Sequence, residues 1–153
     1  MTTESQFQTN TVSRIRLLRV NSITIGVPED QVLTVTEWYE PTPLPFAPTS
    51  VFGVASIQGR MFTVVDVGLI LDLETSLQGD RTIVALHGDE QLALAVNSAN
   101  DSIEIDESQV TSKGESTSIR GRVQLEGKDV LLLDVDALFA GVIRGKERRR
   151  RRL

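Results

Sequence analysis

Asp134 and Asp136 come nearest to a metal site by residue type and spacing, since two carboxylates one residue apart can share a cation. The stretch DVDALF, however, lacks the glycine and the distal glutamate of a calcium loop and runs directly into apolar residues. His87 is the only histidine, and the chain has no cysteine that would complete a metal or catalytic cluster around it. We therefore expect no bound metal and no cofactor.

The sequence also contains none of the short motifs that carry catalysis. G-x-S-x-G, H-E-x-x-H, the phosphate-binding Walker loop and the dinucleotide fingerprint G-x-G-x-x-G are all missing. An enzyme needs an acid, a base or a nucleophile held in a cleft, and no residue of the chain stands out for such a role. The pattern favours a binding module over an enzyme.

An internal repeat organises the chain. Gly53–Leu71 reads GVASIQGRMFTVVDVGLIL, and 68 residues later Gly121–Phe139 reads GRVQLEGKDVLLLDVDALF. Two copies are too few for a solenoid, so the repeat predicts two similar halves packed together. The residues assigned to structural turns and caps in the two copies are Gly53, Gly59, Asp66, Gly121, Gly127 and Asp134.

Each copy is expected to form a hairpin followed by a short helix. The turn glycines Gly59 and Gly127 supply a backbone conformation that residues with a Cβ atom avoid. Asp66 and Asp134 are expected to accept hydrogen bonds from the free backbone N–H groups that begin a helix. These are structural roles, and they are favoured over catalysis for both aspartates.

Most of the remaining sequence predicts short strands. Apolar and polar residues alternate with a period of two, and glycine, asparagine, aspartate and proline punctuate the runs. About ten strands of this kind predict an all-β barrel or sandwich with short helical segments. Strands are expected near Ile15–Leu17, Ile23–Val27, Val32–Trp38, Phe52–Ile57, Met61–Val67, Thr82–Leu86, Gln91–Val96, Ser102–Ile105, Arg122–Leu125 and Val130–Leu133.

The chain divides into three parts. Residues 1–11 are polar and expected to be disordered, residues 12–143 form the folded domain, and its two halves are expected to join near residues 72–80. No apolar run approaches the roughly 18–20 residues needed to cross a bilayer, and the first residues lack the apolar core of an export signal. We expect a cytoplasmic protein.

Charge is unevenly distributed. Residues 144–153, RGKERRRRRL, carry seven positive groups and one negative group, a net charge of +6. Because the whole chain carries −5, residues 1–143 carry −11, which argues against nucleic-acid binding. The basic tail is expected to be disordered. Two interpretations of it stay open: a solubilising extension without a partner, or weak contact with an anionic membrane or an acidic protein.

A proline-rich segment, Glu40–Pro48 (EPTPLPFAP), cannot join a central strand. Its Pro45 and Pro48 match a P-x-x-P spacing that suits a reader of proline motifs. A stiff crossing segment within the fold is the favoured interpretation.

Four blocks of the sequence, in this order, resemble the CheW-like domain of bacterial chemotaxis signalling. The resemblance covers about residues 12–140, so residues 12–143 are expected to form a CheW-like domain. It implies two SH3-like five-stranded β-barrels around a shared hydrophobic core, in agreement with the repeat. The blocks are Ile23–Glu37, Leu44–Leu71, Ala93–Val110 and Ile119–Phe139.

The resemblance implies a non-enzymatic adaptor. Members of the family bind the cytoplasmic tip of methyl-accepting chemoreceptors and the regulatory domain of the CheA histidine kinase, at membrane-associated receptor arrays. Barrel edges offer apolar strips to such partners. The family's interface block places the partner-binding residues of this chain at Val54, Ser56, Gln58, Gly59 and Arg60.

This chain departs from the family pattern inside that block. The family commonly has asparagine and arginine where this chain has Ser56 and Gln58, while Arg60 lies just beyond the turn glycine. Glutamine cannot make the charged bidentate contact of arginine. An alternative is therefore a divergent CheW-like protein of a twitching-motility or accessory pathway that binds a different protein partner.

Overall fold

The computed structural model describes residues 12–71, 76–88, 90–112, 118–138 and 140. The expected disordered N-terminus, residues 1–11, and the basic tail, residues 144–153, lie outside these ranges. Within the described residues, no helix is long and apolar enough to cross a membrane.

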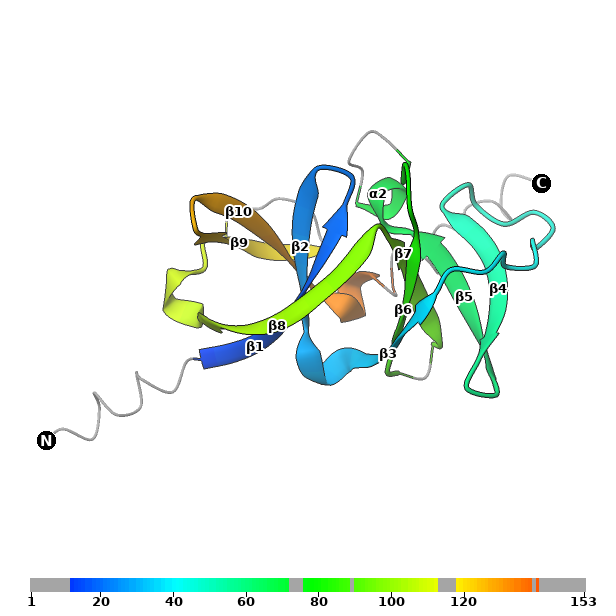
Figure 1. The fold of residues 1–153 in the computed structure, drawn as a ribbon, viewed down its shortest axis with the longest axis horizontal. Helices are drawn as coiled ribbons and strands as arrows, with labels where there is room; N and C mark the ends of the chain where they lie inside the picture. The colour runs from blue at the N-terminus through cyan, green and yellow to red at the C-terminus, as the bar shows by residue number, and fades with distance from the viewer. Residues whose placement is uncertain (1–11, 72–75, 89, 113–117, 139, 141–153) are drawn as a thin grey trace, which may run out of the picture.

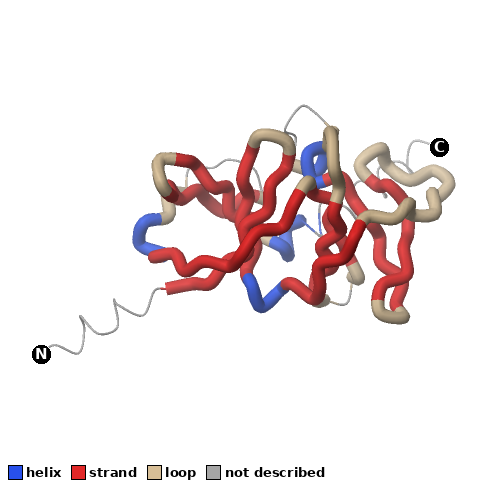
Figure 2. The backbone as a smooth tube through the Cα atoms, in the orientation of Figure 1, coloured by secondary structure: helices blue, strands red, loops and turns tan. Residues whose placement is uncertain are grey.

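Strands make up most of the described chain (Figure 2). The all-β prediction is confirmed, and short helical segments follow both repeat aspartates, at α2 and at residues 135–138. The strands are β1 Val12–Val20, β2 Ile23–Pro28, β3 Val32–Glu37, β4 Val51–Ile57, β5 Arg60–Asp66, β6 Thr82–Leu86, β7 Leu92–Val96, β8 Ser98–Asp106, β9 Ile119–Leu125 and β10 Lys128–Leu133. The short helices are η1 Glu29–Gln31, α2 Val67–Ile70 and η2 Glu107–Gln109.

The strands form two five-stranded sheets that lie side by side along the long axis of the molecule (Figure 1). One has the order β3-β6-β7-β5-β4 and uses consecutive strands, so we call it the contiguous barrel. The other has the order β8-β1-β2-β10-β9 and combines strands from both ends of the chain, so we call it the split barrel. Each contains one parallel pair, β5 with β7 and β10 with β2.

An equivalent bridge closes each sheet into a barrel. Thr42, shortly after β3, exchanges two backbone hydrogen bonds of 2.8 Å with Val54 of β4. Thr111, shortly after β8, exchanges two hydrogen bonds of 2.8 Å with Arg122 of β9. Each bridge joins the two ends of its sheet order, so the predicted pair of barrels is confirmed.

The two barrels are not divided where the sequence analysis placed the junction. β5, before residues 72–80, and β6, after them, belong to the same sheet. The chain instead crosses between barrels at η1 and at Asn97, because β1 and β2 pair with strands from the other end of the chain. The repeat predicted two halves, but it could not show that the N-terminal strands complete the second one.

Asn97 holds the second crossing in place. Its side-chain amide, almost fully buried, donates to the carbonyl oxygens of Gln78 and Asp80 at 2.6 Å each. Its Oδ1 accepts a hydrogen bond from the backbone N–H of Asn21, in the β1–β2 turn. Residues 76–80 of the contiguous barrel are thereby tied to a turn of the split barrel.

Equivalent hydrogen bonds are made by the aspartates in the two copies of the repeat. Asp66 Oδ1 accepts from the N–H of Leu69 at 3.4 Å, and Asp134 Oδ1 accepts from the N–H of Ala137 at 3.1 Å. The aspartate backbones match as well: Asp66 N–H donates to Ser50 at 2.7 Å and Asp134 N–H donates to Ser118 at 2.9 Å. Both aspartates thus accept a hydrogen bond from the backbone N–H three residues on, as the N-cap of a helix does.

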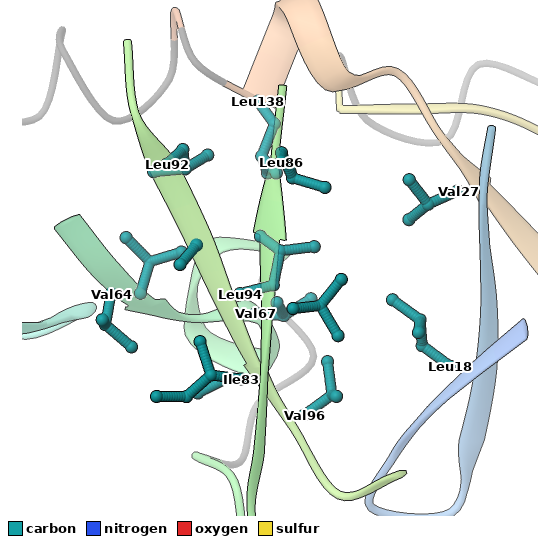
Figure 3. Close-up of a cluster of buried hydrophobic side chains, with 14 of the residues drawn as sticks. Leu18, Val27, Val64, Val67, Ile83, Leu86, Leu92, Leu94, Val96 and Leu138 are labelled. Atoms are coloured by element: carbon teal, nitrogen blue, oxygen red, sulfur yellow. The ribbon is translucent and has the colours of Figure 1, made fainter. Parts of the chain in front are cut away.

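The main hydrophobic core lies between the barrels and extends into the contiguous one. Leu18 and Val27, from the split barrel, face Leu94 and Val96 of β7, and Leu138 packs over the same cluster (Figure 3). A smaller cluster fills the split barrel: Ile15, Ile105, Val123, Val130 and Leu132. A register shift in β1 between Arg16 and Leu18 changes which face the strand buries, so one strand serves both cores.

Candidate functional site

The five residues predicted to contact a partner all lie on the β4–β5 hairpin. Along β4, Gly53, Ala55 and Ile57 are buried, whereas Val54 is half-buried and Ser56 is exposed. This alternation is the period of a strand with one face on the core. It turns Val54 and Ser56 outward from the contiguous barrel.

The hairpin turn presents the other three predicted residues. Gln58 and Gly59 have φ values of 52° and 79°, the left-handed pair that matches the twist of the flanking strands. A Cβ atom on Gly59 would meet nothing within 4 Å, so glycine is favoured here by backbone conformation and not by space. Arg60 is exposed and makes no ion pair with any residue that the structure describes.

Two residues of this surface were missed by the sequence analysis. Met61 stands directly opposite Ser56 in the hairpin register and is 54% exposed. Tyr39 is 41% exposed, and its hydroxyl donates to the backbone oxygen of Ser56. The alternation of Met61 with buried Phe62 could have predicted that Met61 faces outward. Tyr39, in contrast, reaches the hairpin only through the tertiary fold.

The base of the hairpin is held by an aromatic cluster. The rings of Trp38 and Phe52 meet edge to face with centroids 5.4 Å apart. The Arg81 guanidinium lies 5.1 Å from the Trp38 centroid and 4.8 Å from that of Phe52, within cation–π range of both rings. Phe52 sits where the β4–β5 register shifts, so the cluster stabilises the bulge from which the hairpin extends.

The split barrel carries the equivalent hairpin, β9–β10, with a different surface. The Arg122 guanidinium lies 3.2 Å from Oδ2 of Asp129, and the Gln124 amide donates to the same carboxylate. Arg122 and Gln124 correspond to Val54 and Ser56 across the 68-residue repeat. The outward face of this second hairpin therefore carries an ion pair, whereas no ion pair between described residues lies on that of the first.

Comparison with known proteins agrees with the fold and the repeat. The sequence matches the family model described as the CheW-like domain over residues 14–142.

The chain belongs to the CheW-like domain family.

Two curated relatives, both named Chemotaxis protein CheW, are similar along almost their whole length. The protein of Rhizobium meliloti (strain 1021) is 25% identical over 147 residues, which cover 91% of this chain and 95% of the relative. The protein of Bacillus subtilis (strain 168) is 26% identical over 137 residues, covering 84% and 88%. The crystal structure of the scaffolding protein TtCheW from Thermoanaerobacter tengcongensis has the same fold, with a TM-score of 0.71 at 17% identity, covering 80% of this chain and 88% of that one.

Two bidentate ion pairs of this CheW-like chain lie in the split barrel or at its edge. Glu29 accepts two hydrogen bonds from Arg16, at 2.9 and 3.0 Å, and these hold the pKa of Glu29 below its usual value. Glu107 accepts two from Arg120, at 2.9 and 3.0 Å, and its pKa is lowered by the same cause. Both pairs are bidentate, the strongest geometry for an arginine and a carboxylate.

The residues first considered for chemistry have structural settings in the CheW-like fold. Asp134 caps the helical residues that follow it, and Asp136 is exposed. His87 is exposed, and its backbone N–H donates to Gln31 at 2.8 Å. In the described ranges, no three side chains of histidine, aspartate or glutamate gather as metal ligands do.

Proposed function

We propose that this protein is a chemotaxis-type adaptor that joins a chemoreceptor to a CheA-type histidine kinase through protein–protein contacts. Family membership and two relatives named for chemotaxis support the pathway. The contacts would be made with the cytoplasmic tip of a methyl-accepting receptor and with the regulatory domain of the kinase. The adaptor would work in the cytoplasm, at membrane-associated receptor arrays.

The observation that carries this proposal is the outward face of the β4–β5 hairpin. Val54, Ser56 and Met61 form a neutral, partly apolar strip, and Arg60 ends it with a cation that pairs with no described residue. Arginine beside an apolar strip is a common composition of interface centres. A hairpin held by the Thr42 bridge and the aromatic cluster presents this strip with little loss of conformational entropy on binding.

The adaptor is proposed to be non-enzymatic. The hairpin site offers a methionine, a valine, a serine, a glutamine and an arginine, but among the described residues no hydrogen bond joins the serine hydroxyl to a general base that could activate it. Side chains of these types are suited to contacting and orienting a partner protein. The signal would pass as a change in how the partners are held against the adaptor.

Gln58 favours a second candidate function. It occupies the exposed turn position where the family commonly has arginine. Without that charge, the receptor contact is weaker or is directed to a different protein, which suits a CheW-like adaptor of a twitching-motility or accessory pathway. Gln58→Arg separates the two, since φ of 52° is equally strained for both side chains.

The proposal is tested by calorimetry with two purified probes, the regulatory domain of the organism's CheA-type kinase and a cytoplasmic tip fragment of its receptor. The wild-type chain is expected to bind both. Arg60→Ala is expected to lower the affinity for one of the two probes about tenfold. Gln58→Arg is expected to raise the affinity for the receptor fragment. Lys128→Ala, at the equivalent position of the other hairpin, is the matched control and should change neither. Absence of binding to both probes would reject the adaptor role.

A further inference from the structure

Met61 is an exposed apolar side chain at a position where the barrel itself does not need one. It is 54% exposed on the outward side of β5, whereas the next residue, Phe62, is buried. The equivalent residue, 68 positions on, is Asp129, a charged side chain in an ion pair. Because the second hairpin forms with aspartate at this position, Met61 serves the surface of the first hairpin and not the packing of its barrel.

The chain offers few side chains that a mild oxidant attacks. It contains no cysteine, and its only methionines are Met1 and Met61. Thiols and thioethers are the groups that peroxides oxidise most readily in proteins. Met61 is therefore the one side chain of this class in the chain beyond its first residue, and its exposure gives an oxidant access to it.

Met61 also occupies the middle of the proposed binding surface. Ser56 stands directly opposite it in the hairpin register, and Val54, which pairs with Thr63, is its diagonal neighbour. Side chains directly opposite one another on a sheet have Cβ atoms about 5 Å apart and interact. A change in the polarity of Met61 is thus a change in the polarity of the whole strip.

We infer that Met61 is an oxidation site through which a peroxide weakens partner binding at the β4–β5 hairpin. The inference rests on the proposed adaptor function and adds a regulation to the same surface. In the reaction, the thioether sulfur attacks one oxygen of hydrogen peroxide, so that an S–O bond forms and the O–O bond breaks. The second oxygen leaves as water, the sulfur is oxidised by two electrons to the sulfoxide, and the peroxide is reduced.

The sulfoxide changes what the strip offers to a partner. Oxidation converts a flexible apolar side chain into a polar one, whose oxygen accepts hydrogen bonds and loses them when a partner covers it. The hydroxyl of Ser56, directly opposite, can donate to that oxygen, which holds the polar group on the strip. Methionine sulfoxide reductases return the side chain to the thioether, so the change is reversible.

The first test is oxidation of the full-length chain with dilute hydrogen peroxide, followed by peptide mass spectrometry and calorimetry. The peptide that holds Met61 is expected to gain one oxygen atom. Affinity for the probe that Arg60→Ala weakens, either the kinase regulatory domain or the receptor tip fragment, is expected to fall at least about fivefold. Treatment with methionine sulfoxide reductases should restore it. An excess of the same probe during oxidation should slow the uptake of oxygen at Met61.

Two substitutions separate the sulfur from other effects of peroxide. Met61→Leu keeps an apolar side chain of similar volume without a sulfur, and it retains Met1 as the matched control for oxidation elsewhere. Its affinity after peroxide should equal its own affinity before peroxide. Met61→Gln places a polar amide at the same position and is expected to lower affinity without any peroxide. The melting temperature of the oxidised wild-type chain should not change, because Met61 faces outward.

Four results would overturn the inference while the adaptor function stands. These are oxidation of Met1 with Met61 intact, an oxidised Met61 with unchanged affinity, an equal loss of affinity in peroxide-treated Met61→Leu, and a lower melting temperature that explains the loss by unfolding. An untreated wild-type chain that binds neither probe would instead reject the adaptor function, and the regulation would fall with it.

Discussion

The contiguous and split barrels have the same backbone arrangement but carry different side chains at equivalent positions. Phe52 and Arg120 are equivalent in the repeat, and each lies at a register shift. In the contiguous barrel Phe52 meets Trp38, the first residue after β3. In the split barrel Arg120 pairs with Glu107, the first residue after β8. An aromatic contact and an ion pair thus perform the same task of joining a bulge to the strand before it.

The two hairpins differ in the same sense. Val54 and Met61 make the outward strip of the contiguous hairpin neutral and partly apolar up to Arg60, whereas Arg122 and Asp129 pair on the split hairpin. Side chains that satisfy one another within a molecule have little left to offer a partner. This difference supports our proposal that the contiguous barrel carries the partner-binding surface.

Alanine at the first glycine of each repeat is expected to give the largest difference. A Cβ atom on Gly53 would lie 2.2 Å from the Thr42 oxygen, at a φ of 146°. On Gly121 it would lie 2.8 Å from the Thr111 oxygen and 2.7 Å from a movable methyl of Val110. Gly53→Ala is expected to lower the free energy of unfolding by roughly 3 kcal/mol or more, and Gly121→Ala by about 1–2 kcal/mol. Urea unfolding measures both, and equal losses would contradict the difference in strain.

The two capping aspartates also differ between the barrels in the hydrogen bonds that they accept. Asp66 is buried and accepts from Leu77 N–H at 3.1 Å in addition to its capping bond, whereas Asp134 makes the capping bond with Ala137. Asp66→Ala leaves a buried N–H without its acceptor and is expected to cost about 3 kcal/mol, against about 1 kcal/mol for Asp134→Ala. Denaturant midpoints report both values. A larger loss for Asp134→Ala would mean that Leu77 finds another acceptor.

Exchanging the outward side chains of the two hairpins tests whether an ion pair on a hairpin prevents it from binding a partner. Val54→Arg with Met61→Asp copies the Arg122–Asp129 pair onto the contiguous barrel. We expect partner affinity to fall at least about tenfold, or about 1.4 kcal/mol, while stability changes little because both positions face outward. The reverse exchange, Arg122→Val with Asp129→Met, should leave affinity unchanged. If the reverse exchange lost binding instead, the split barrel would be the binding one.

Acid is expected to weaken the split barrel first, with a small effect. The ion pair with Arg120 lowers the pKa of Glu107 from 4.5. Its contribution is present above the unfolded pKa and is lost as pH falls through the lower folded value. Because the pair is partly exposed, we expect at most about 1 kcal/mol. Glu107→Gln should lose less stability than wild type between pH 7 and pH values below 4.5, and equal losses would show that the pair contributes nothing.

The candidate site was predictable where its signal is local. Alternation along β4 and the Gln58–Gly59 turn are properties of a few neighbouring residues, so they could be read before the fold was known. Tyr39 could not, because exposure depends on what the rest of the chain covers. Arg81 is separated by many residues from Trp38 and Phe52, and nothing in its own neighbourhood indicates the contact.

The sequence by itself determined the strand pattern, the duplicated hairpins and the aspartate caps, since these depend on side-chain periodicity and on backbone preferences within a few residues. Only the tertiary structure decided which strands share a barrel. β1 and β2 close the split barrel because their apolar residues are buried against strands from the other end of the chain. Pairing of that kind depends on the fit of two distant surfaces, and the spacing of residues along the chain does not encode it locally.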